Sequence, residues 1–330
     1  MAENDNILEM KNVVYSFHTY GGEVKAVRDV SFAVRKGEIL GIVGESGCGK
    51  SVTAQCIMRL NPEPPGFFEG GEILFDGKNV LKMSNKELRK LRGQDIGFVF
   101  QDPMTSLNPT MRVGAQIEEV FLGRTDVTKK EVKEKALEIM RLVGISDVEK
   151  RYKQYPHELS GGMKQRVMIA IALVSRPGLV ICDEPTTSLD VTIEAQILDL
   201  LLELRDKLGM SIIMITHDLG VIARMCDRVI VMYGGKIVEK GTVQEIFYDT
   251  AHPYTKGLIG SIAKLDTKKG ERLQSIEGTP PDLFFPPKGC PFAARCEYAM
   301  DVCKDEPPYQ YKLTDEHFTN CWLQNEYAPD

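Results

Sequence analysis

The alternation of apolar and polar residues predicts strands near the start of the chain. The alternation is weak over residues 7–17 (ILEMKNVVYSF) and clear over residues 26–34 (AVRDVSFAV). A third segment, EILGIVG at 38–44, is mostly apolar and runs into glycines, which is typical of a buried strand. The pattern therefore predicts an N-terminal β layer.

Between residues 115 and 175 the apolar residues recur with the period of a helix. Four of them lie at spacings of four, three and four in a charged segment, which places them on one helix face. They are Val132, Ala136, Ile139 and Val143. Two apolar strands follow, ending at Cys182 and at Thr216, with a helical stretch between them. This order predicts a strand, helix and strand unit of an α/β core.

The character of the chain changes after about residue 255. Proline and cysteine concentrate in PPDLFFPPKGCP (280–291) and in EPPY (306–309), and no helical or strand period continues. We therefore expect a core over 1–255, with a helical insert at about 103–175, and a small separate extension over 256–330. No internal repeat is visible, so the core is present once.

Composition excludes several classes of protein. Of the 330 residues, 43% are hydrophobic and 27% are charged, as in ordinary globular proteins, and the net charge of −6 argues against a nucleic acid partner. The start, MAENDNILEM, lacks the basic and apolar segments of a signal peptide. The longest apolar stretches fall short of the roughly 20 residues that span a bilayer. We expect a chain that stays in the cytosol and does not itself cross a membrane.

A glycine-rich segment, GESGCGKS at 44–51, follows the third predicted strand and precedes a helix. It fits the phosphate-loop pattern GxxxxGK[ST], in which glycines let successive amides face a phosphate and the helix start favours an anion. Lys50 can reach the β and γ phosphates, and the Ser51 hydroxyl can ligate Mg²⁺. A dinucleotide-binding fold is disfavoured, because GxGxxG is satisfied from neither Gly44 nor Gly47. The candidate phosphate-binding residues are Gly44, Ser46, Gly47, Cys48, Gly49, Lys50, Ser51 and Val52.

Two acidic residues end the apolar strand in GLVICDEP. Asp183 is placed to hold Mg²⁺, directly or through water, and Glu184 to accept a proton from the attacking water. Alone, such a pair is as often a solvated turn. Beside a phosphate loop it predicts a nucleotide-hydrolysing site.

The segment LSGGMKQ at 159–165 precedes an apolar helix. Here the sequence resembles the ATPase subunits of ABC transporters, whose signature is LSGGQ. Met163 departs from the family glutamine, whereas Ser160, Gly161 and Gly162 are retained. The resemblance implies an α/β fold: a P-loop NTPase (ABC ATPase) core with an N-terminal antiparallel β subdomain and an α-helical subdomain. The small Cys-rich extension at the C-terminus is additional.

The resemblance also implies a dimer and further site residues. In the family, the signature of one subunit closes over the ATP of another, and Ser188, Leu189 and Asp190 resemble the D-loop that crosses this dimer. Gln101 resembles the glutamine that senses Mg²⁺ and the water. His217 resembles the switch histidine that contacts the γ phosphate.

An aromatic residue of the N-terminal segment is expected at the adenine. Phe17 lies where the family stacks an aromatic ring on that base. Tyr15 and Tyr20 are close enough in the sequence to compete for this role.

Four segments resemble the peptide-import subfamily, which takes up dipeptides, oligopeptides or nickel: 101–109, 163–173, 252–262 and 277–296. The sequence most resembles its dipeptide-type ATPase. The implied partners are a second ABC ATPase subunit, paralogous or identical, two membrane permeases and, indirectly, an external solute-binding protein. The implied place is the cytoplasmic face of the membrane. The alternatives are nickel or oligosaccharide import, or a non-transport ABC ATPase of repair, translation or cluster assembly. In the family, repair ATPases interrupt the core with long coiled coils, translation ATPases carry two cores, and cluster-assembly ATPases lack the HPY segment.

Four of the eight cysteines lie in the last 41 residues, separated by five, six and 17 residues. The spacing lacks the short pair of a structural zinc site, so we expect a [4Fe-4S] cluster with a structural role. Zinc, with His317 as a substitute ligand, and the absence of any metal are the alternatives. The predicted ligands are Cys290, Cys296, Cys303 and Cys321.

Overall fold

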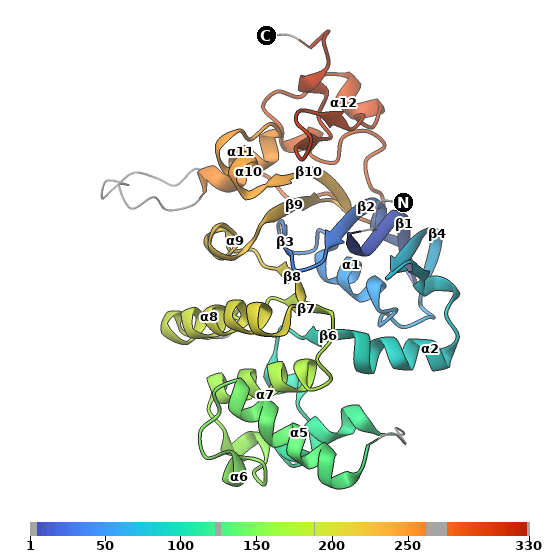
Figure 1. Ribbon diagram of the computed structural model, residues 1–330. Helices are drawn as coiled ribbons and strands as arrows, with labels where there is room; N and C mark the ends of the chain where they lie inside the picture. The colour runs from blue at the N-terminus through green and yellow to red at the C-terminus, as the bar shows by residue number, and fades with distance from the viewer. Residues whose placement is uncertain (1–4, 123–126, 188, 262–275, 329–330) are drawn as a thin grey trace. The chain divides into compact units, whose positions relative to one another are not determined.

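The chain folds into two compact units, and Figure 1 labels most of their elements. The computed structural model describes residues 5–122, 127–187, 189–261 and 276–328. Unit 1 comprises the described residues of Met1–Ile7, Val34–Glu38 and Lys82–Met214. Unit 2 comprises those of Leu8–Ala33, Ile39–Leu81 and Ile215–Asp330. The predicted domain boundary at 255/256 rests on the change in amino-acid composition there, and it stays a prediction.

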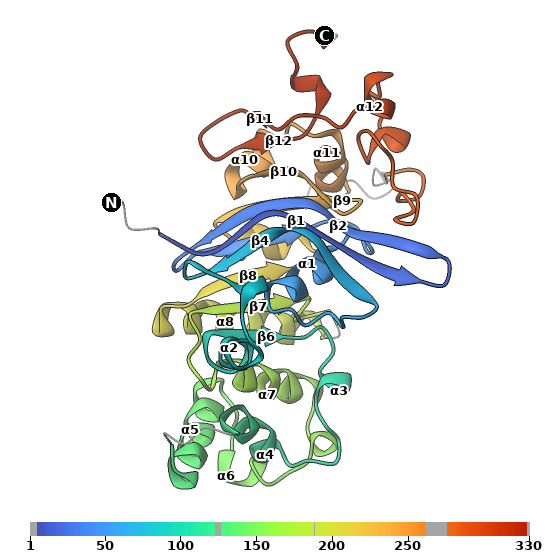
Figure 2. The same ribbon diagram turned by 90° about the vertical axis from the view of Figure 1, so that its right-hand side faces the viewer.

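Unit 2 contains a four-stranded sheet of strand order β2-β1-β4-β5, whose three long strands run side by side in Figure 2. The pairings of β4 with β1 and with β5 are antiparallel. The predicted N-terminal β layer is therefore present. Its strands are β1 Asn6–Thr19, β2 Gly22–Arg35, β4 Gly66–Phe75 and β5 Lys78–Asn79.

Five strands of the second sheet belong to unit 2, and they follow the order β11-β12-β10-β9-β3. Strand β3 (Ile39–Val43) is buried along its whole length and pairs in parallel with β9 (Arg228–Tyr233). No strand was predicted in the extension over 256–330, called the tail below, but it adds two short strands, β11 (Tyr311–Lys312) and β12 (Phe318–Thr319). Strand β12 pairs with β10 (Lys236–Thr242) and with β11. The helices of unit 2 are α1 Lys50–Ile57, α9 Leu219–Met225, α10 Val243–Tyr248, α11 Pro253–Gly260 and α12 Val302–Asp305.

One apolar cluster joins the sheet of unit 2 to the tail. Val43 of β3 and Tyr233 of β9 belong to it together with Tyr254 of α11 and Phe292. These side chains are at most 4% exposed. The phosphate-loop strand and the C-terminal region thus share a core, and burial of that apolar area stabilises both.

Unit 1 contains the strand, helix and strand pattern that the sequence predicts. Strand β7 (Leu179–Asp183) pairs in parallel with β6 (Ile96–Val99), and α8 (Val191–Leu208) leads from β7 to β8 (Ser211–Ile215). The remaining helices of unit 1 are α2 Asn85–Lys90, α3 Pro103–Ser106, α4 Val113–Glu118, α5 Lys129–Leu142, α6 Val148–Arg151 and α7 Gly161–Leu173.

The helical insert begins α5 with a capping box. The Thr128 hydroxyl accepts from the Glu131 amide at 3.3 Å, and the Glu131 carboxylate accepts from the Thr128 amide at 2.7 Å. Ala136 and Ile139 are buried, as their spacing predicts. No helix in the described parts of the chain is long and apolar enough to cross a membrane.

Candidate functional site

The glycine-rich loop connects β3 to α1 in unit 2, and two of its glycines have no substitute. Gly44 has φ 152° and Gly49, the N-cap of α1, has φ 98°. A Cβ atom at Gly44 would lie 2.2 Å from the carbonyl oxygen of Met232, and one at Gly49 would lie 2.4 Å from that of Ala26. Neighbouring backbone therefore shapes the loop, and only glycine fits at these two positions.

Lys50 begins α1 and is buried at 5% exposure. Its Nζ donates to the carbonyl oxygens of Gly44 at 2.7 Å and of Glu45 at 3.0 Å. Both acceptors are neutral, so the ammonium retains a positive charge that a phosphate can match. The charge and the loop together suit an anionic ligand.

The remaining loop residues differ in exposure. Ser46 and Gly47 are exposed, whereas Cys48 is buried and burial raises the pKa of its thiol. Ser51 and Val52, in the first turn of α1, are half-buried. The accessible part of the loop is thus its middle.

The three aromatic candidates for the adenine have different environments. Tyr15 is fully buried, and its ring meets those of Phe17 and Phe68 edge-on at centroid distances of 5.2 and 4.7 Å. Burial raises the pKa of Tyr15 to about 12. Phe17 is half-buried and Tyr20 is exposed. Tyr15 is therefore a core residue, and only Phe17 and Tyr20 have a ring that a base could reach.

The two acidic residues lie at the carboxyl end of β7 in unit 1. Asp183 is its last residue and is buried, and Glu184 follows with φ 47°, a conformation that is uncommon for a residue with a side chain. Glu184 Oε2 accepts a hydrogen bond from Gln101 Nε2 at 3.0 Å and one from the Thr187 hydroxyl at 2.9 Å. The structure thus brings together Gln101 and Glu184, which are 83 residues apart in the sequence.

Sequence reasoning missed Thr187. It stands three residues after Glu184 in a polar turn, and hydroxyls are common in such turns. Proximity to a candidate base was the one available signal.

The signature segment begins α7 in unit 1. The Ser160 hydroxyl caps the helix and accepts from the Met163 amide at 3.4 Å. Ser160 and Gly161 are exposed, and a Cβ atom at Gly162 would lie 2.9 Å from the side chain of Ile193. The helix start is thus exposed at Ser160 and Gly161, and its role as an anion site stays a prediction.

Asp190 caps α8 in the same unit. Its Oδ1 accepts from the amides of Thr192 at 3.1 Å and Ile193 at 3.0 Å, and the residue is exposed. Ser188, its neighbour in the predicted D-loop, lies outside the described residues.

His217 follows β8 and is exposed. The amide of the preceding Thr216 donates to the Ile42 carbonyl of β3 at 3.3 Å. Asp218 next caps α9, accepting from the Gly220 amide at 2.6 Å. His217, Phe17 and the phosphate loop belong to unit 2, whereas Gln101, Asp183, Glu184, the signature segment and Asp190 belong to unit 1.

The four tail cysteines pack as part of the protein interior. Cys290, Cys303 and Cys321 are buried and Cys296 is half-buried. Cys290 and Cys303 belong to the apolar cluster of unit 2. Burial raises the pKa of Cys290 to about 12 and that of Cys321 to about 11, which favours neutral thiols that behave as small apolar side chains.

The metal prediction for these cysteines requires correction. Within the part of the chain that the structure describes, no group of three or more His, Cys, Asp or Glu side chains is placed to hold a metal ion. The prediction of a [4Fe-4S] cluster is therefore wrong, and the same finding removes the zinc alternative. His317, the substitute zinc ligand, instead lies with Nε2 2.8 Å from Oε1 of Glu239, and both side chains are buried.

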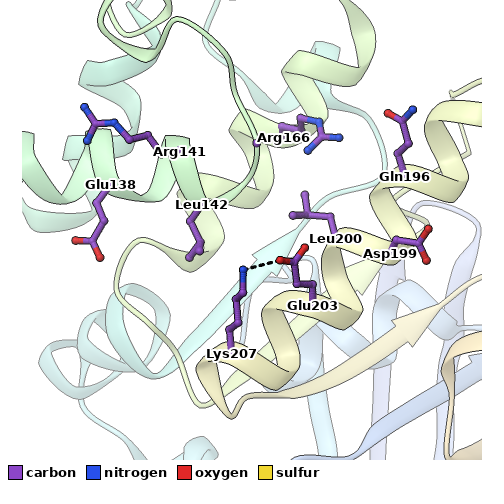
Figure 3. Close-up of a pocket in the computed structure, with 10 residues that line it drawn as sticks. Glu138, Arg141, Leu142, Arg166, Gln196, Asp199, Leu200, Glu203 and Lys207 are labelled. Carbon is purple, nitrogen blue, oxygen red and sulfur yellow. Dashed lines mark hydrogen bonds and ion pairs between the residues drawn. The ribbon is translucent and has the colours of Figure 1, made fainter.

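A separate cavity of about 720 Å³ lies among α5, α7 and α8 of unit 1 (Figure 3). Its charged side chains are largely engaged: Lys207 pairs with Glu203, and Arg166 donates to the Val143 carbonyl. Predicted site residues are not among the residues that line it, which are Glu138, Arg141, Leu142, Gly144, Arg166, Gln196, Asp199, Leu200, Glu203 and Lys207.

The sequence matches two known families. Residues 27–187 match the family described as ABC transporter, and residues 238–303 match the one described as oligopeptide/dipeptide transporter, C-terminal region. The chain is 56% identical over 329 residues to the oligopeptide transport ATP-binding protein OppD of Bacillus subtilis (strain 168), covering 100% of this chain and 92% of the relative. It is 54% identical over 324 residues to the dipeptide transport ATP-binding protein DppD of the same strain, covering 98% and 96%.

A solved structure shares the fold. The ATP-binding cassette MJ0796, described as a dimer in a post-hydrolysis state bound to ADP and Pi, aligns with a TM-score of 0.64 at 28% identity. The alignment covers 72% of this chain and 98% of the cassette. The predicted α/β ABC ATPase fold is confirmed. The chain therefore belongs to the ABC transporter family, among the ATP-binding proteins with the oligopeptide/dipeptide transporter C-terminal region.

Proposed function

We propose that the chain is the ATP-hydrolysing subunit of a membrane ABC transporter and that it powers the import of dipeptides or oligopeptides. The observation that carries the proposal is the carboxylate of Glu184, held at the end of β7 by hydrogen bonds from Gln101 and Thr187. A half-buried carboxylate there can accept a proton from a water that attacks the terminal phosphate of ATP. The peptide cargo is supported by the names of the relatives, which are oligopeptide and dipeptide transport proteins.

The binding groups come from unit 2. The residues from Gly44 to Val52 would surround the phosphates with main-chain amides, and the buried Lys50 would add a positive charge. Phe17 or Tyr20 would stack on the adenine. His217 would contact the γ phosphate.

Mg²⁺ is the metal that the family implies. The Ser51 hydroxyl, the Asp183 carboxylate and the Gln101 amide oxygen would hold it, and all three are the hard oxygen donors that Mg²⁺ prefers. When bound, the ion neutralises charge on the β and γ phosphates. Gln101 would also orient the attacking water, because its amide already lies 3.0 Å from the proposed base.

The active form would be a dimer of ABC ATPase subunits, identical or paralogous. Ser160, Gly161 and Gly162 of one subunit would bind the nucleotide of the other, and Asp190 would lie near the dimer contact. The dimeric cassette with ADP and Pi is a precedent for this arrangement. ATP binding would close the dimer, and hydrolysis with product release would reopen it.

Two membrane permeases would receive this motion, and an external solute-binding protein would deliver the peptide. The helical segment of about 103–175 within the ATPase domain 1–255 would contact the permeases, with the extension 256–330 attached to that domain. The protein would thus lie peripherally on the cytoplasmic face of the membrane.

The test is reconstitution of the chain with its two permeases and second ATPase subunit in lipid vesicles. We expect ATP-dependent uptake of di- or oligopeptides when the binding protein is added. Uptake of nickel or oligosaccharide without peptide uptake would contradict the cargo. ATPase activity stimulated by DNA or ribosomes, and not by the permeases, would contradict transport altogether.

Mixed dimers test the signature residues. A Ser160→Ala subunit paired with a wild-type subunit should impair the nucleotide site completed by the altered signature and leave the other site working. The measurement is ATP turnover at each site, with one site silenced at a time by Glu184→Gln in the corresponding subunit. Equal impairment of both sites would contradict the proposed exchange.

A further inference from the structure

The phosphate loop is held by residues of α11 and of the segment after Ile276 at one of its residues, Glu45. The Glu45 carboxylate accepts two hydrogen bonds from Arg295, from Nη1 to Oε2 at 2.6 Å and from Nη2 to Oε1 at 3.0 Å. The Glu45 amide donates to the hydroxyl of Tyr254 at 2.8 Å. Both ends of this residue are thus bound by residues more than 200 positions away, all within unit 2.

Arg295 is itself rigidly placed. Its side chain is 6% exposed, against 25% for that of Glu45. It donates to the hydroxyl of Tyr233 at 3.0 Å and to the carbonyl oxygens of Glu277 at 2.8 Å and Ile276 at 3.0 Å. A bidentate charge-assisted pair with little exposure is stronger and more directional than a surface ion pair.

Tyr254 is equally constrained. It is fully buried in α11, and its ring packs on Tyr233 and Phe292 at centroid distances of 4.5 and 5.3 Å. Its hydroxyl therefore presents a fixed acceptor to the Glu45 amide.

Glu45 transmits these constraints to the nucleotide-binding lysine. The Glu45 carbonyl oxygen accepts a hydrogen bond from Lys50 Nζ at 3.0 Å. The amide of the same residue is bound by Tyr254 and its carboxylate by Arg295. Arg295 also neutralises the Glu45 carboxylate, which would otherwise repel the phosphates of ATP from inside the loop.

We infer that Arg295 and Tyr254 are positioning residues of the phosphate loop, so that the C-terminal region sets the affinity of this chain for ATP. The inference rests on the proposed function, because it takes ATP as the ligand of the loop. Because the coupling of two sites is reciprocal, ATP binding should also stabilise the contacts of Arg295. It should therefore slow hydrogen exchange of the backbone amides of residues 277–328.

The test is the binding of a fluorescent ATP analogue to the purified full-length chain, without hydrolysis. We expect Arg295→Met to weaken binding about 5- to 50-fold. Tyr254→Phe, which removes one acceptor and keeps the ring, should weaken it about 2- to 10-fold. In the double variant Arg295→Met with Glu45→Gln, removal of the stranded carboxylate should restore most of the affinity, an effect that mere loss of structure would not produce.

Arg228→Met is the matched control. Arg228 pairs with Glu316 of the tail at 3.1 Å in the same unit, with 15% of its side chain exposed. It should leave ATP affinity within about 2-fold of wild type. Equal weakening in Arg228→Met and Arg295→Met, unchanged binding in Arg295→Met, or no rescue by Glu45→Gln would overturn the inference.

Folding and function are separated within the same experiment. Thermal unfolding identifies a variant that fails to fold. If Arg295→Met fails to fold, the ATP affinities of Tyr254→Phe and Arg295→Lys test the inference instead. Wild-type affinity in both variants would overturn it. A wild-type chain that binds no ATP would instead contradict the proposed function.

Discussion

The phosphate loop of unit 2 and the end of β7 in unit 1 each carry a glutamate, and the two glutamates have different surroundings. Glu45 of the phosphate loop is neutralised by a bidentate ion pair with the nearly buried Arg295. Glu184 at the end of β7 accepts hydrogen bonds from an amide and a hydroxyl, both neutral, and Gln101 is exposed. The first carboxylate is paired with a cation, while the second is half-buried beside neutral donors.

The surrounding backbone differs in the same way. Around the loop, carbonyl groups of Met232 and Ala26 leave no room for side chains at Gly44 and Gly49. A loop that binds an anion with main-chain amides needs such fixed geometry. A group that exchanges protons with water needs access to it and a fixed orientation, and the hydrogen bonds from Gln101 and Thr187 help to provide that orientation.

The largest effect is expected for Glu184→Gln. The amide cannot accept the proton of the attacking water, so ATP turnover in the assembled transporter should fall by roughly 10²- to 10⁴-fold while ATP binding persists. Glu203→Gln, on the exposed surface of α8 in the same unit, is the control and should leave turnover unchanged. Turnover of Glu184→Gln near the wild-type value would show that another group is the base.

Gly49→Ala tests whether the loop is as rigid as its surroundings suggest. The added Cβ would meet the Ala26 carbonyl at 2.4 Å in a left-handed conformation, so we expect the free energy of unfolding to fall by about 2–4 kcal/mol.

Gly47→Ala measures the cost of the positive φ angle without a steric clash of the added Cβ atom. Gly47 has φ 77°, but nothing lies within 4 Å of a Cβ atom there, so only about 1–2 kcal/mol should be lost. Denaturant unfolding of both variants measures the difference, and equal losses would mean that the contact with Ala26 relaxes.

Lys50→Ala should lower the affinity for ATP, whereas Glu184→Gln should lower ATP turnover. Removing a buried ammonium that would pair with the phosphates should weaken ATP binding about 10- to 100-fold. Titration with a fluorescent ATP analogue measures this, with the exposed Lys11→Ala on β1 as the control. Wild-type affinity in Lys50→Ala would remove the lysine from the binding site.

A pH-dependent effect concerns α11, which carries Tyr254. His252 caps α11, its Nδ1 accepting from the Tyr254 amide at 3.1 Å, and burial lowers its pKa to about 3. Below pH about 6.5 the unfolded chain gains a proton that the folded chain does not. The free energy of unfolding should therefore fall as the pH drops from 6.5 towards 3, by up to about 1.4 kcal/mol per pH unit.

His252→Asn keeps a capping acceptor without a titrating group, so it should lose this part of the pH dependence. Urea unfolding at pH 7 and pH 5 compares it with the wild type. An identical difference between the two pH values in both proteins would show that His252 does not contribute.

Local patterns predicted much of the fold and of the candidate site. The alternation over 26–34 lies in β2, and the spacing of Ala136 and Ile139 matches the buried face of α5. Such patterns work because strand and helix periods depend on neighbouring residues. The same reasoning located the glycine loop and the acids after β7, since both are defined by a few consecutive residues.

The cysteine prediction shows where spacing is insufficient. Four thiols near the C-terminus suggested metal ligands, but Cys290 and Cys303 pack into the apolar cluster, and the described residues contain no metal-holding group. Residue spacing cannot tell a ligand from a core residue, because both roles favour burial.

The sequence by itself determined the loop that can surround a phosphate, the acids at a strand end and the helix start of the signature, because each depends on the chemistry of adjacent residues. Only the tertiary structure decided that Tyr15 lies in the core, that Gln101 holds Glu184, and that Arg295 neutralises Glu45 from 250 residues away. These pairings depend on which distant segments folding brings together. No local period or motif encodes that choice.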